Sequence, residues 1–398
     1  MVALAPSGSH PINRERVKIL LIIDHFGTGG AQRQLVELAC GLKRRGHAVH
    51  VFVYFPEHGF FRPRLDADCI PVHEYRKGKG FSFGVIRELV SLFSTGDFDV
   101  VISFLNSPNI YAELATLVAR RARLVVSERT SRLDDKSLVS ALLRRALHRV
   151  ANHVVVNSRT HCEWLNGLWW LKGRVSCIYN GVDVSSFDRR CPVPESGREL
   201  RLLAVGRVGP EKNVINLVAA LARFQEQFGY APSVNWVGPR DASRTGRRYC
   251  TQAEKLLASL PEVQRRWQWL GVRSDVAELL AEHHALIHPS LYEGLPNVVC
   301  EALAAGMPVL ASRVCDHPLL VTEGARGFLF DPNDASSIAE SMWKLTELSK
   351  ESWMSYSRNA RKYAEENLGV ERMVAAYENL CTSLLQTQRA SARGHAEG

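Results

Sequence analysis

Two glutamates eight residues apart, Glu293 and Glu301, flank a Gly-Leu-Pro sequence. The apolar run that begins at Ala285 predicts a strand, Gly294 can supply a turn position with positive φ, and Pro296 suits the first position of a helix. We therefore expect Glu293 in a loop at the end of a strand and Glu301 in the early part of a helix. Carboxylates at these places can accept hydrogen bonds from sugar hydroxyl groups.

The expected helix start is also a candidate anion site. Its first backbone N–H groups, those of Asn297 and Val298, have no partner inside the helix, and the helix dipole favours an anion such as a phosphate. A phosphate bound there would lie between the two glutamates. The alternative is that Glu293 and Glu301 are solvated surface acids around an ordinary helix start, which is the commoner case for two glutamates considered alone.

Cations that could bind a diphosphate occur in a second loop, at Arg207 and Lys212. The apolar run Leu202–Val205 predicts a strand before them, and Asn213 is a candidate cap for the helix that follows. An arginine there can make charge-assisted hydrogen bonds to a pyrophosphate, and a lysine can supply a point charge. In isolation, the pair is equally well explained as surface cations of a strand-to-helix loop.

A glycine-rich segment near the N-terminus is a third candidate. The run Lys18–Asp24 predicts a strand, and Gly29 and Gly30 precede a helix that we expect to begin near Ala31. These glycines allow the backbone to approach a ligand closely. The sequence is not G-x-G-x-x-G, which disfavours a dinucleotide site. A tight turn without a ligand is the alternative.

Together these segments resemble the retaining GT-B glycosyltransferases of the large GT4-type family, also called glycosyl transferases group 1. The stretch from Glu293 to Val309 follows the family's E-x7-E pattern, with Glu-Gly-Leu-Pro-Asn, Glu-Ala and Ala-Gly-Met-Pro-Val in order. Arg207 and Lys212 resemble the arginine and lysine that contact the donor diphosphate. The Gly-Gly-Ala-Gln-Arg sequence from Gly29 resembles the family's N-terminal loop, which meets the donor phosphate and the acceptor.

The resemblance implies a role for each residue of the donor site. Glu293 would bind the transferred sugar near its 3-hydroxyl, and Glu301 would bind the ribose hydroxyls. Arg207 and Lys212 would stabilise the diphosphate as it leaves, so that Glu293, Arg207 and Lys212 are the implied catalytic residues. The resemblance also implies that Val272 and Arg273 lie near the nucleotide base. The other implied donor-binding residues are Gly29, Gly30, Gly294, Leu295, Pro296, Asn297 and Val298.

The acceptor side is less well defined by the resemblance. The segment Ser127–Thr130 ends an expected strand, at a place where the family has acceptor or sugar contacts. Many relatives have a histidine in this region, whereas this chain has Glu128 and Arg129. The acceptor-side candidates are these two residues and Asn106.

Strand-like runs alternate with helical segments along the chain, which predicts two parallel-sheet α/β domains. In the family that the chain resembles, these are Rossmann-like, doubly wound domains that face each other across a cleft, the GT-B fold. The expected strands are residues 18–24, 49–55, 100–105, 124–127, 153–157, 175–179, 202–205, 234–237, 267–270, 285–288, 308–311 and 327–330. The expected divisions are a flexible tail (1–14), an N-terminal acceptor-side domain (15–184), a linker (185–199), a C-terminal nucleotide-sugar domain (200–368) and a helix (369–388) that packs back on the first domain.

We expect neither a metal nor a cofactor. The segment Asp66–Asp68 has the D-x-D form by which another class of glycosyltransferases holds a metal, but it precedes an apolar run, and we interpret it as a surface turn. His283 and His284 have no third ligand at a useful spacing. Arg207, Lys212 and helix N-termini can neutralise a diphosphate without a metal.

Composition limits the class of protein. The 398 residues, 46% of them hydrophobic, suffice for two cores of ordinary size. No apolar run approaches the length of a membrane span, and residues 1–14 lack the apolar centre of a signal peptide, so we expect a cytoplasmic protein. Nine cysteines without a C-x-x-C pair disfavour a disulfide framework and a zinc ribbon.

Positive charge is concentrated in one part of the chain. Residues 115–175 contain 12 Lys and Arg against 4 Asp and Glu, a net +8 of the total +9. Such a surface suits a lipid diphosphate acceptor or the anionic inner face of the cell membrane. Leu142, Leu143, Ala146 and Val150 form an apolar stripe at helical spacing, which we expect to face the core. No nucleic-acid-binding motif accompanies the charge, so we expect no nucleic acid partner.

The implied function is the transfer of a hexose or N-acetylhexosamine from a UDP- or GDP-linked sugar to a hydroxyl acceptor, with retention of configuration and without a metal. A lipid-linked glycan in bacterial surface polysaccharide synthesis is the expected acceptor, and the protein is expected at the inner face of the membrane or in the cytoplasm. The alternatives are a GT-B-fold sugar-nucleotide epimerase or hydrolase, a non-catalytic sugar-nucleotide-binding protein, and a basic scaffold on a membrane or on nucleic acid.

Overall fold

The computed structural model describes residues 16–129, 138–187, 192–195 and 200–394. The expected tail 1–14 and parts of the expected linker 185–199 lie outside the described residues. Contacts between Cα atoms divide the chain into two compact units. Unit 1 consists of residues 1–125 and 381–398, and unit 2 consists of residues 126–380.

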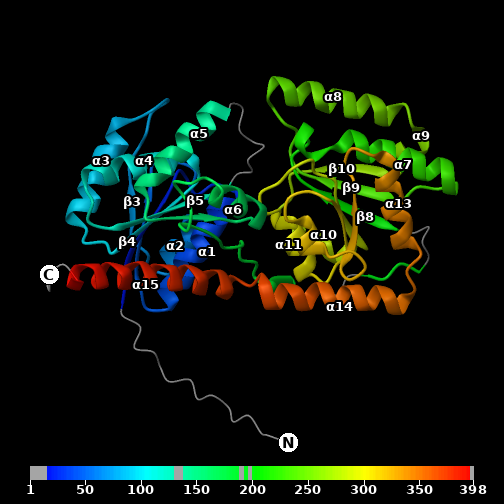
Figure 1. Cartoon of the computed structure of the whole chain (residues 1–398). Coiled ribbons are helices and arrows are strands. Elements are labelled where there is room, and N and C mark those ends of the chain that lie inside the picture. The colour runs from blue at the N-terminus through cyan, green and yellow to red at the C-terminus, as the bar shows by residue number, and fades with distance from the viewer. Residues whose placement is uncertain (1–15, 130–137, 188–191, 196–199, 395–398) are drawn as a thin grey trace, which may run out of the picture. The chain divides into compact units, whose positions relative to one another are not determined.

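A seven-stranded parallel sheet is built from the first half of the chain, with the strand order β3-β2-β1-β4-β5-β6-β7 (Figure 1). Its strands are β1 (Lys18–Ile23), β2 (Ala48–Val53), β3 (Val72–Glu74), β4 (Val100–Phe104), β5 (Arg123–Glu128), β6 (His153–Val156) and β7 (Val175–Cys177). The helices of this part are α1 (Gly30–Arg44), α2 (Arg62–Ala67), α3 (Phe83–Thr95), α4 (Asn106–Val118), α5 (Leu138–Leu147) and α6 (Arg159–Asn166).

The second half contains a six-stranded sheet with the order β10-β9-β8-β11-β12-β13. Its strands are β8 (Arg201–Val205), β9 (Ser233–Val237), β10 (Trp267–Gly271), β11 (Ala285–His288), β12 (Val309–Ser312) and β13 (Gly327–Phe330). The helices that follow them are α7 (Val214–Phe228), α8 (Arg244–Ala258), α9 (Pro261–Arg265), α10 (Val276–Glu282), α11 (Asn297–Ala304), α12 (His317–Val321), α13 (Ala335–Thr346), α14 (Lys350–Asn367) and α15 (Val370–Gly394).

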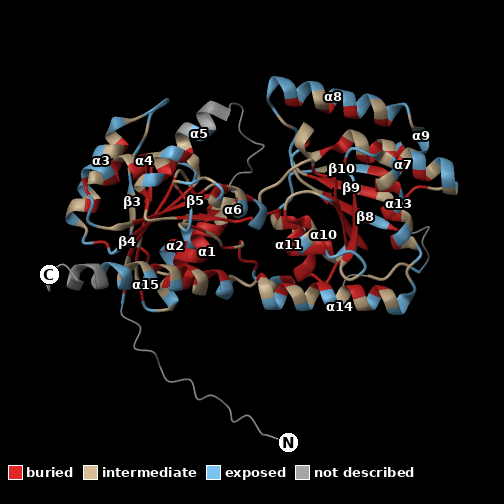
Figure 2. Ribbon diagram, in the orientation of Figure 1, coloured by how far each residue is buried: buried red, intermediate tan, exposed pale blue. Residues whose placement is uncertain are grey.

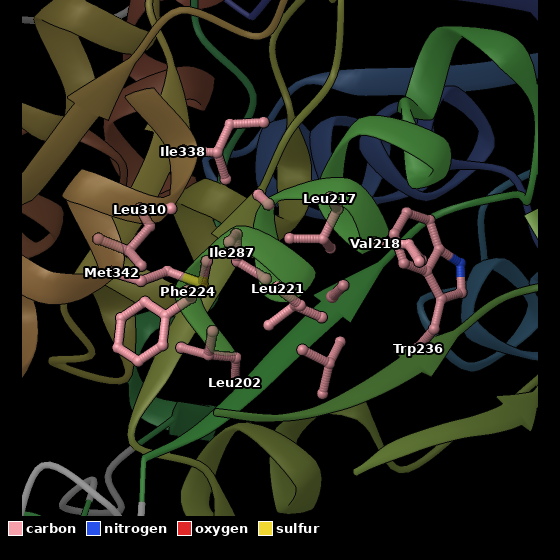
Figure 3. Close-up of a cluster of buried hydrophobic side chains, with 14 of the residues drawn as sticks. Leu202, Leu217, Val218, Leu221, Phe224, Trp236, Ile287, Leu310, Ile338 and Met342 are labelled. Atoms are coloured by element: carbon pink, nitrogen blue, oxygen red, sulfur yellow. The ribbon is translucent and has the colours of Figure 1, made fainter. Parts of the chain in front are cut away.

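The six-stranded sheet is buried on both faces, because alternate residues of a strand point to opposite sides. Leu202 belongs to a core with Leu217 and Phe224 of α7, while Leu203 belongs to a second core on the other face. Figure 3 shows side chains of the first core. The helix α7 contacts α8 and α13, whereas α11 contacts α14 (Figures 1 and 2). The sheet is therefore doubly wound.

The helix pattern of α7 shows how the sequence determines this packing. Val214, Leu217, Val218 and Leu221 are buried at the spacing of one helix face. Asn213 precedes the helix as predicted, but the predicted side-chain cap is wrong. Its backbone is left-handed with φ 59°, and its side-chain amide donates to the carbonyl of Pro332 over 2.7 Å.

The predicted strands are confirmed within one or two residues at most ends. The strand β3 is not among the expected ones, since its three residues are too few to show an alternating pattern. Asp66 belongs to the last turn of α2 and Asp68 follows that helix, so the turn expected over Asp66–Asp68 is correct only for its last residue.

The prediction that the apolar stripe of α5 faces the core is wrong for Leu142 and Ala146. Leu142 is 44% exposed, and Ala146 is exposed as well. Among the side chains of this helix that the structure describes, the buried one is instead Arg145, which is 1% exposed. A buried carboxylate, that of Glu128, attracts Arg145 to the inside. The ion pair between Arg145 and Glu128 therefore determines which side of α5 faces the interior, and hydrophobic periodicity predicts that side incorrectly.

Candidate functional site

The candidate donor residues lie at the point where the strand order of the second sheet reverses. β8 and β11 are neighbours in the sheet, and the chain leaves β8 toward β9 but leaves β11 toward β12. Loops that follow two such strands diverge, and ligands of doubly wound folds bind in the crevice between them. Arg207 and Lys212 follow β8, and Glu293 follows β11. The N–H of Leu291 donates to the carbonyl of Glu211 over 2.9 Å and joins the two loops.

Lys212 and Glu293 form an ion pair in this crevice. The Nζ atom of Lys212 donates to Oε1 of Glu293, and the two side chains are 19% and 16% exposed. A Cβ atom at Gly206 would lie 3.0 Å from Cε of Lys212, so the glycine makes room for the lysine stem. The structure thus brings together two of the three predicted catalytic residues.

His288, at the end of β11, also contacts Glu293. Its Nε2 atom lies 3.0 Å from Oε1 of Glu293 and 3.1 Å from Oγ of Ser290. Burial lowers the pKa of His288. A neutral imidazole can therefore donate Nε2–H to the carboxylate. The sequence pattern predicts only that His288 ends an apolar strand, and no local signal identifies it as a contact of Glu293.

Glu293 is ionised in this environment. Burial alone raises the pKa of its carboxyl, but the hydrogen bond with His288 and the positive charge of Lys212 outweigh burial and hold the pKa well below its usual range. The backbone N–H of Glu293 lies 3.5 Å from Sγ of Cys315, which helps to fix the loop. The site therefore presents a fixed carboxylate beside a lysine ammonium group.

Arg207, the third predicted catalytic residue, lies at the exposed part of the same loop. Its side chain is 54% exposed, and its guanidinium donates to Oε1 of Glu211 over 2.7 Å. Glu211 and Lys212 belong to the short turn η5 (Pro210–Lys212), and Arg207 lies just before it. Both cations therefore belong to the loop that follows β8. Arg207 is therefore accessible to an incoming anion, although it does not contact Glu293.

The helix α11 begins one residue later than predicted. Pro296, predicted at the first helical position, is its N-cap, and Asn297 is the first helical residue. Glu301 is 7% exposed and lies four residues after Asn297, on the same side of the helix. The side chains of Leu295 and Val298 are buried in the core, so these two positions present only their backbone to a ligand.

The prediction of a positive φ angle at Gly294 is wrong, because Gly294 is not among the residues with positive φ. A Cβ atom at this position would lie 3.4 Å from the carbonyl oxygen of Arg129 and 3.4 Å from Oδ1 of Asn157. These are ordinary van der Waals distances, so the loop at Gly294 lies against a neighbouring segment that leaves room for a Cβ atom. The carbonyl of Arg129, an acceptor-side candidate, is thereby placed against the donor loop.

A chain of hydrogen bonds runs from Arg129 to the start of α11. The Arg129 guanidinium donates to Oδ1 of Asn180, and Nδ2 of Asn180 donates to Oδ1 of Asn297 over 2.6 Å. The same guanidinium donates to Oη of Tyr377 over 2.8 Å. Burial lowers the pKa of Arg129. Asn180 is absent from the predicted site, because an Asn-Gly pair is typical of a turn and carries no sign of what the asparagine side chain contacts.

Glu128 is fully buried in a cluster of basic side chains. Its Oε2 lies 2.7 Å from Nε2 of His161, and its Oε1 lies 3.3 Å from Nε of Arg145 and 3.5 Å from Nε2 of His148. Burial raises the pKa of Glu128, but hydrogen bonds with both histidines and the charge of Arg145 reverse this effect, so the pKa lies well below its usual range. The ring of Trp164 lies 4.5 Å from the Arg145 guanidinium and closes the cluster.

Val272 and Arg273 follow β10 at the edge of the sheet, two strands from β8. Val272 is 75% exposed. The Nε atom of Arg273 donates to Oδ1 of Asp275 over 2.7 Å. The structure thus places these two candidates on an exposed loop of the same sheet, away from the crevice between β8 and β11.

Unit 1 has its own point of strand reversal, between β1 and β4. Gly29 is the N-cap of α1 and Gly30 its first residue, and Asn106 begins α4 directly after β4. Leu105 holds a strained φ of 78° just before Asn106. The Oδ1 atom of Asn106 is buried without a hydrogen-bond partner. A strained residue and an unpaired acceptor at a switch point are features of a ligand site.

Within the part of the chain that the structure describes, no group of three or more His, Cys, Asp or Glu side chains is arranged to hold a metal ion. His283 and His284 are each 3% exposed. Nδ1 of His284 accepts from the N–H of Arg201, and Nε2 of His283 lies 2.9 Å from Nδ2 of Asn235. Both histidines thus contact residues of β8 and β9, two interior strands of the sheet.

Comparisons with known proteins agree with this geometry. The model of the Glycosyltransferase Family 4 matches residues 28–186, and the model of the Glycosyl transferases group 1 matches residues 189–364. UDP-Gal:alpha-D-GlcNAc-diphosphoundecaprenol alpha-1,3-galactosyltransferase of Escherichia coli is 26% identical over 44% of this chain, an alignment that spans only 46% of that relative. N-acetylgalactosamine-N,N'-diacetylbacillosaminyl-diphospho-undecaprenol 4-alpha-N-acetylgalactosaminyltransferase of Campylobacter jejuni is 23% identical over 75% of this chain and 81% of that protein.

The fold agrees with solved structures as well. The structure of Anabaena HepE in complex with UDP and glucose aligns with a TM-score of 0.77 at 22% identity, over 92% of this chain and 100% of that chain. This likeness confirms the predicted α/β GT-B fold. The chain belongs to the GT4-type family of GT-B glycosyltransferases.

Proposed function

We propose that this chain is a retaining, metal-independent glycosyltransferase that moves a hexose or an N-acetylhexosamine from a UDP- or GDP-linked sugar to a hydroxyl acceptor. The proposed acceptor is a lipid-linked glycan in bacterial surface polysaccharide synthesis. The names of two relatives support this acceptor class, since both name a sugar on a diphospho-undecaprenol lipid. UDP occurs in the name of the Escherichia coli relative and in the Anabaena complex, which favours UDP among the nucleotides.

The pairing of Lys212 with Glu293 at the strand reversal is the observation that carries the proposal. A donor diphosphate at the start of α11 would meet the unpaired N–H groups of the first helical turn. Lys212 would balance its charge from one side and Arg207 from the solvent side. Before the donor binds, Glu293 and Glu211 pair with these cations and keep them in place.

In the proposed reaction, the bond between the anomeric carbon and the β-phosphate oxygen breaks while the acceptor oxygen bonds to the same carbon from the same face. The leaving phosphate oxygen takes the proton of the acceptor hydroxyl, so the step needs no further reactant. Negative charge grows on the diphosphate, where Arg207 and Lys212 stabilise it. Glu293 orients the sugar through its hydroxyls, and Glu301 binds the ribose. Backbone contacts from Gly294 to Val298 complete the proposed donor site.

We propose a cytoplasmic protein that binds peripherally to the inner face of the membrane, since its proposed acceptor is anchored there. Among the described residues, no helix combines the length and the apolar character that a membrane span requires. Asn106, Glu128 and Arg129 remain the acceptor-side proposals. For Glu128 the proposed role is indirect, because its carboxylate is fully buried and can only position neighbouring groups.

The test is nucleotide release from a panel of UDP-, GDP- and ADP-sugars, with and without a membrane lipid extract. Release that needs the extract and is lost in Glu293→Ala supports the transferase. Release of free or altered sugar without any acceptor would instead indicate a hydrolase or an epimerase. Binding of a nucleotide sugar without release under any condition would indicate a binding protein.

A further inference from the structure

The loop that joins β3 to α3 presents aromatic side chains to solvent. Phe81 is 54% exposed and Phe83 is 79% exposed, and their rings pack edge to face with centroids 5.3 Å apart. Exposed apolar side chains that are contiguous, rather than scattered singly, are features of an interaction site. This loop is distinct from the basic stretch 115–175 that the charge distribution singles out.

The exposure does not arise from a loosely packed loop. The Nζ atom of Lys77 donates to the carbonyl of Gly80 and lies 5.0 Å from the centroid of the Phe55 ring. The N–H of Ser82 donates to Oη of Tyr111 over 3.0 Å, and Phe81 stacks on the Tyr111 ring at 5.2 Å. These contacts fix the backbone while they leave the outer faces of the phenylalanine rings in water.

Positively charged residues precede and follow the aromatic pair in the sequence. Arg76 and Lys79 lie in the loop, and Arg87 lies one helical turn after Phe83 on the exposed side of α3. None of the three forms an ion pair with a carboxylate of the described chain, in contrast to Arg62 on the nearby α2, which pairs with Glu74. Cations with no acidic partner beside exposed aromatic rings complement an anionic lipid surface, where the rings enter the interface and the cations meet phosphates.

The loop is also connected to the candidate ligand site of unit 1. Tyr111 lies on α4, which contacts α3 (Figure 1). The rings of Tyr111 and Tyr54 pack with centroids 5.5 Å apart, and Oη of Tyr54 donates to Oγ of Ser107 over 3.0 Å. Ser107 is next to Asn106, whose Oδ1 is buried and unpaired. A membrane surface in contact with the loop would therefore be joined through packed side chains to the strand reversal of unit 1.

We propose that residues 76–83 form a docking loop for an anionic phospholipid bilayer, with Phe81 and Phe83 inserted at the interface and Arg76, Lys79 and Arg87 on lipid phosphates. The purpose of this docking would be to bring Asn106 to a lipid-linked acceptor, and in this respect the proposal rests on the proposed function. It does not need donor binding or catalysis, so it can be tested separately.

The test is flotation of the full chain with phosphatidylcholine vesicles that contain or lack phosphatidylglycerol. We expect binding that depends on phosphatidylglycerol. The double variant Phe81→Ser/Phe83→Ser should weaken it roughly tenfold or more, because each ring loses its burial in the interface. Lys79→Gln should weaken it about fivefold, the usual effect of one basic residue at an anionic surface. All three side chains are exposed, so we expect the variants to have the same melting temperature as the wild type.

Two other exposed aromatics serve as matched controls. Phe60, in the same unit, is 64% exposed, and Trp169, near Arg149 in the basic stretch, is 74% exposed. Phe60→Ser should bind vesicles as the wild type does. The proposal is wrong if the wild type does not float, if the Phe81/Phe83 variant floats unchanged, or if only Trp169→Ser abolishes flotation. A failure of nucleotide release with normal flotation would overturn the proposed function and leave the docking loop intact.

Discussion

The Nε2 atom of His288 lies 3.0 Å from Oε1 of Glu293, the same oxygen that accepts a hydrogen bond from Lys212. One carboxylate oxygen is thus held by a neutral donor and by a charged one. His288 ends β11 and Lys212 ends the turn after β8, so two strands fix the position of Glu293. This arrangement keeps the carboxylate ionised and fixes its position.

His288 should therefore be a positioning residue for the proposed reaction. We expect His288→Ala to lower kcat/KM for nucleotide release by roughly ten- to a hundredfold, since a hydrogen bond to a charged group contributes about 1.5–3 kcal/mol. Binding of the nucleoside diphosphate without sugar should change little. His288→Gln, which can still donate a hydrogen bond to Glu293, should recover part of the activity. Equal losses for nucleotide and nucleotide sugar would show a merely structural role.

Arg207 should act on the leaving diphosphate from the solvent side of the site. Arg207→Ala should raise the activation free energy by about 1.5–3 kcal/mol, as expected for a lost charge-assisted bond. Arg240→Ala is a matched control, since Arg240 follows the neighbouring strand β9 and also pairs with a glutamate, Glu254. Turnover that is unchanged in Arg207→Ala, or reduced equally in both variants, would remove Arg207 from the proposed mechanism.

The two glutamates of the donor segment should have separable roles. Glu301→Ala should weaken binding of the nucleoside diphosphate and of the nucleotide sugar alike. Glu293→Ala should weaken binding only when the sugar is attached. Calorimetric titration of each variant with both ligands measures the difference. Identical binding losses in the two variants would contradict the assigned roles.

Glu128 should contribute to stability rather than to substrate contact. We expect Glu128→Gln to lower the free energy of unfolding at pH 7 by about 3–5 kcal/mol, because it leaves buried cations without their counter-charge. The pKa of Glu128 is lower in the folded chain than in the unfolded chain, so its charge stabilises the fold above the unfolded pKa of about 4.3. This contribution is lost as the pH falls through the folded pKa.

The difference in unfolding free energy between the wild type and Glu128→Gln should thus be largest above pH 5 and shrink below pH 4. Urea unfolding at a series of pH values measures it. A difference that grows toward acid would reverse the sign assigned to the pKa shift. Glu163→Gln is a suitable control, because Glu163 lies on α6 beside the same cluster and forms no ion pair among the described residues.

Local patterns suffice to predict the strands other than β3, the start of α11 to within one residue, and the loop that carries Arg207 and Lys212, because each depends on a few consecutive residues. The contact of Lys212 with Glu293 spans 81 positions and depends on β8 lying next to β11, which only the family resemblance implies. His288 is missed for the same reason. An apolar strand ending in histidine carries no sign of what the imidazole will contact.

The error in the orientation of α5 has its physical origin in a neighbouring segment. The attraction between Arg145 and Glu128 determines this orientation and outweighs the exposure of Leu142. Hydrophobic periodicity describes one segment at a time, so it cannot include a charge that another segment supplies.

The most direct test of the central claim is the transfer of radiolabelled sugar from its nucleotide to the organic-extractable fraction of membrane lipid, by the wild type and by Lys212→Ala. We predict incorporation by the wild type and a loss of at least tenfold in the variant, because Lys212 fixes Glu293 and, in the proposed reaction, balances the charge of the diphosphate. Incorporation by Lys212→Ala at the wild-type rate would contradict a donor site built on Lys212 and Glu293.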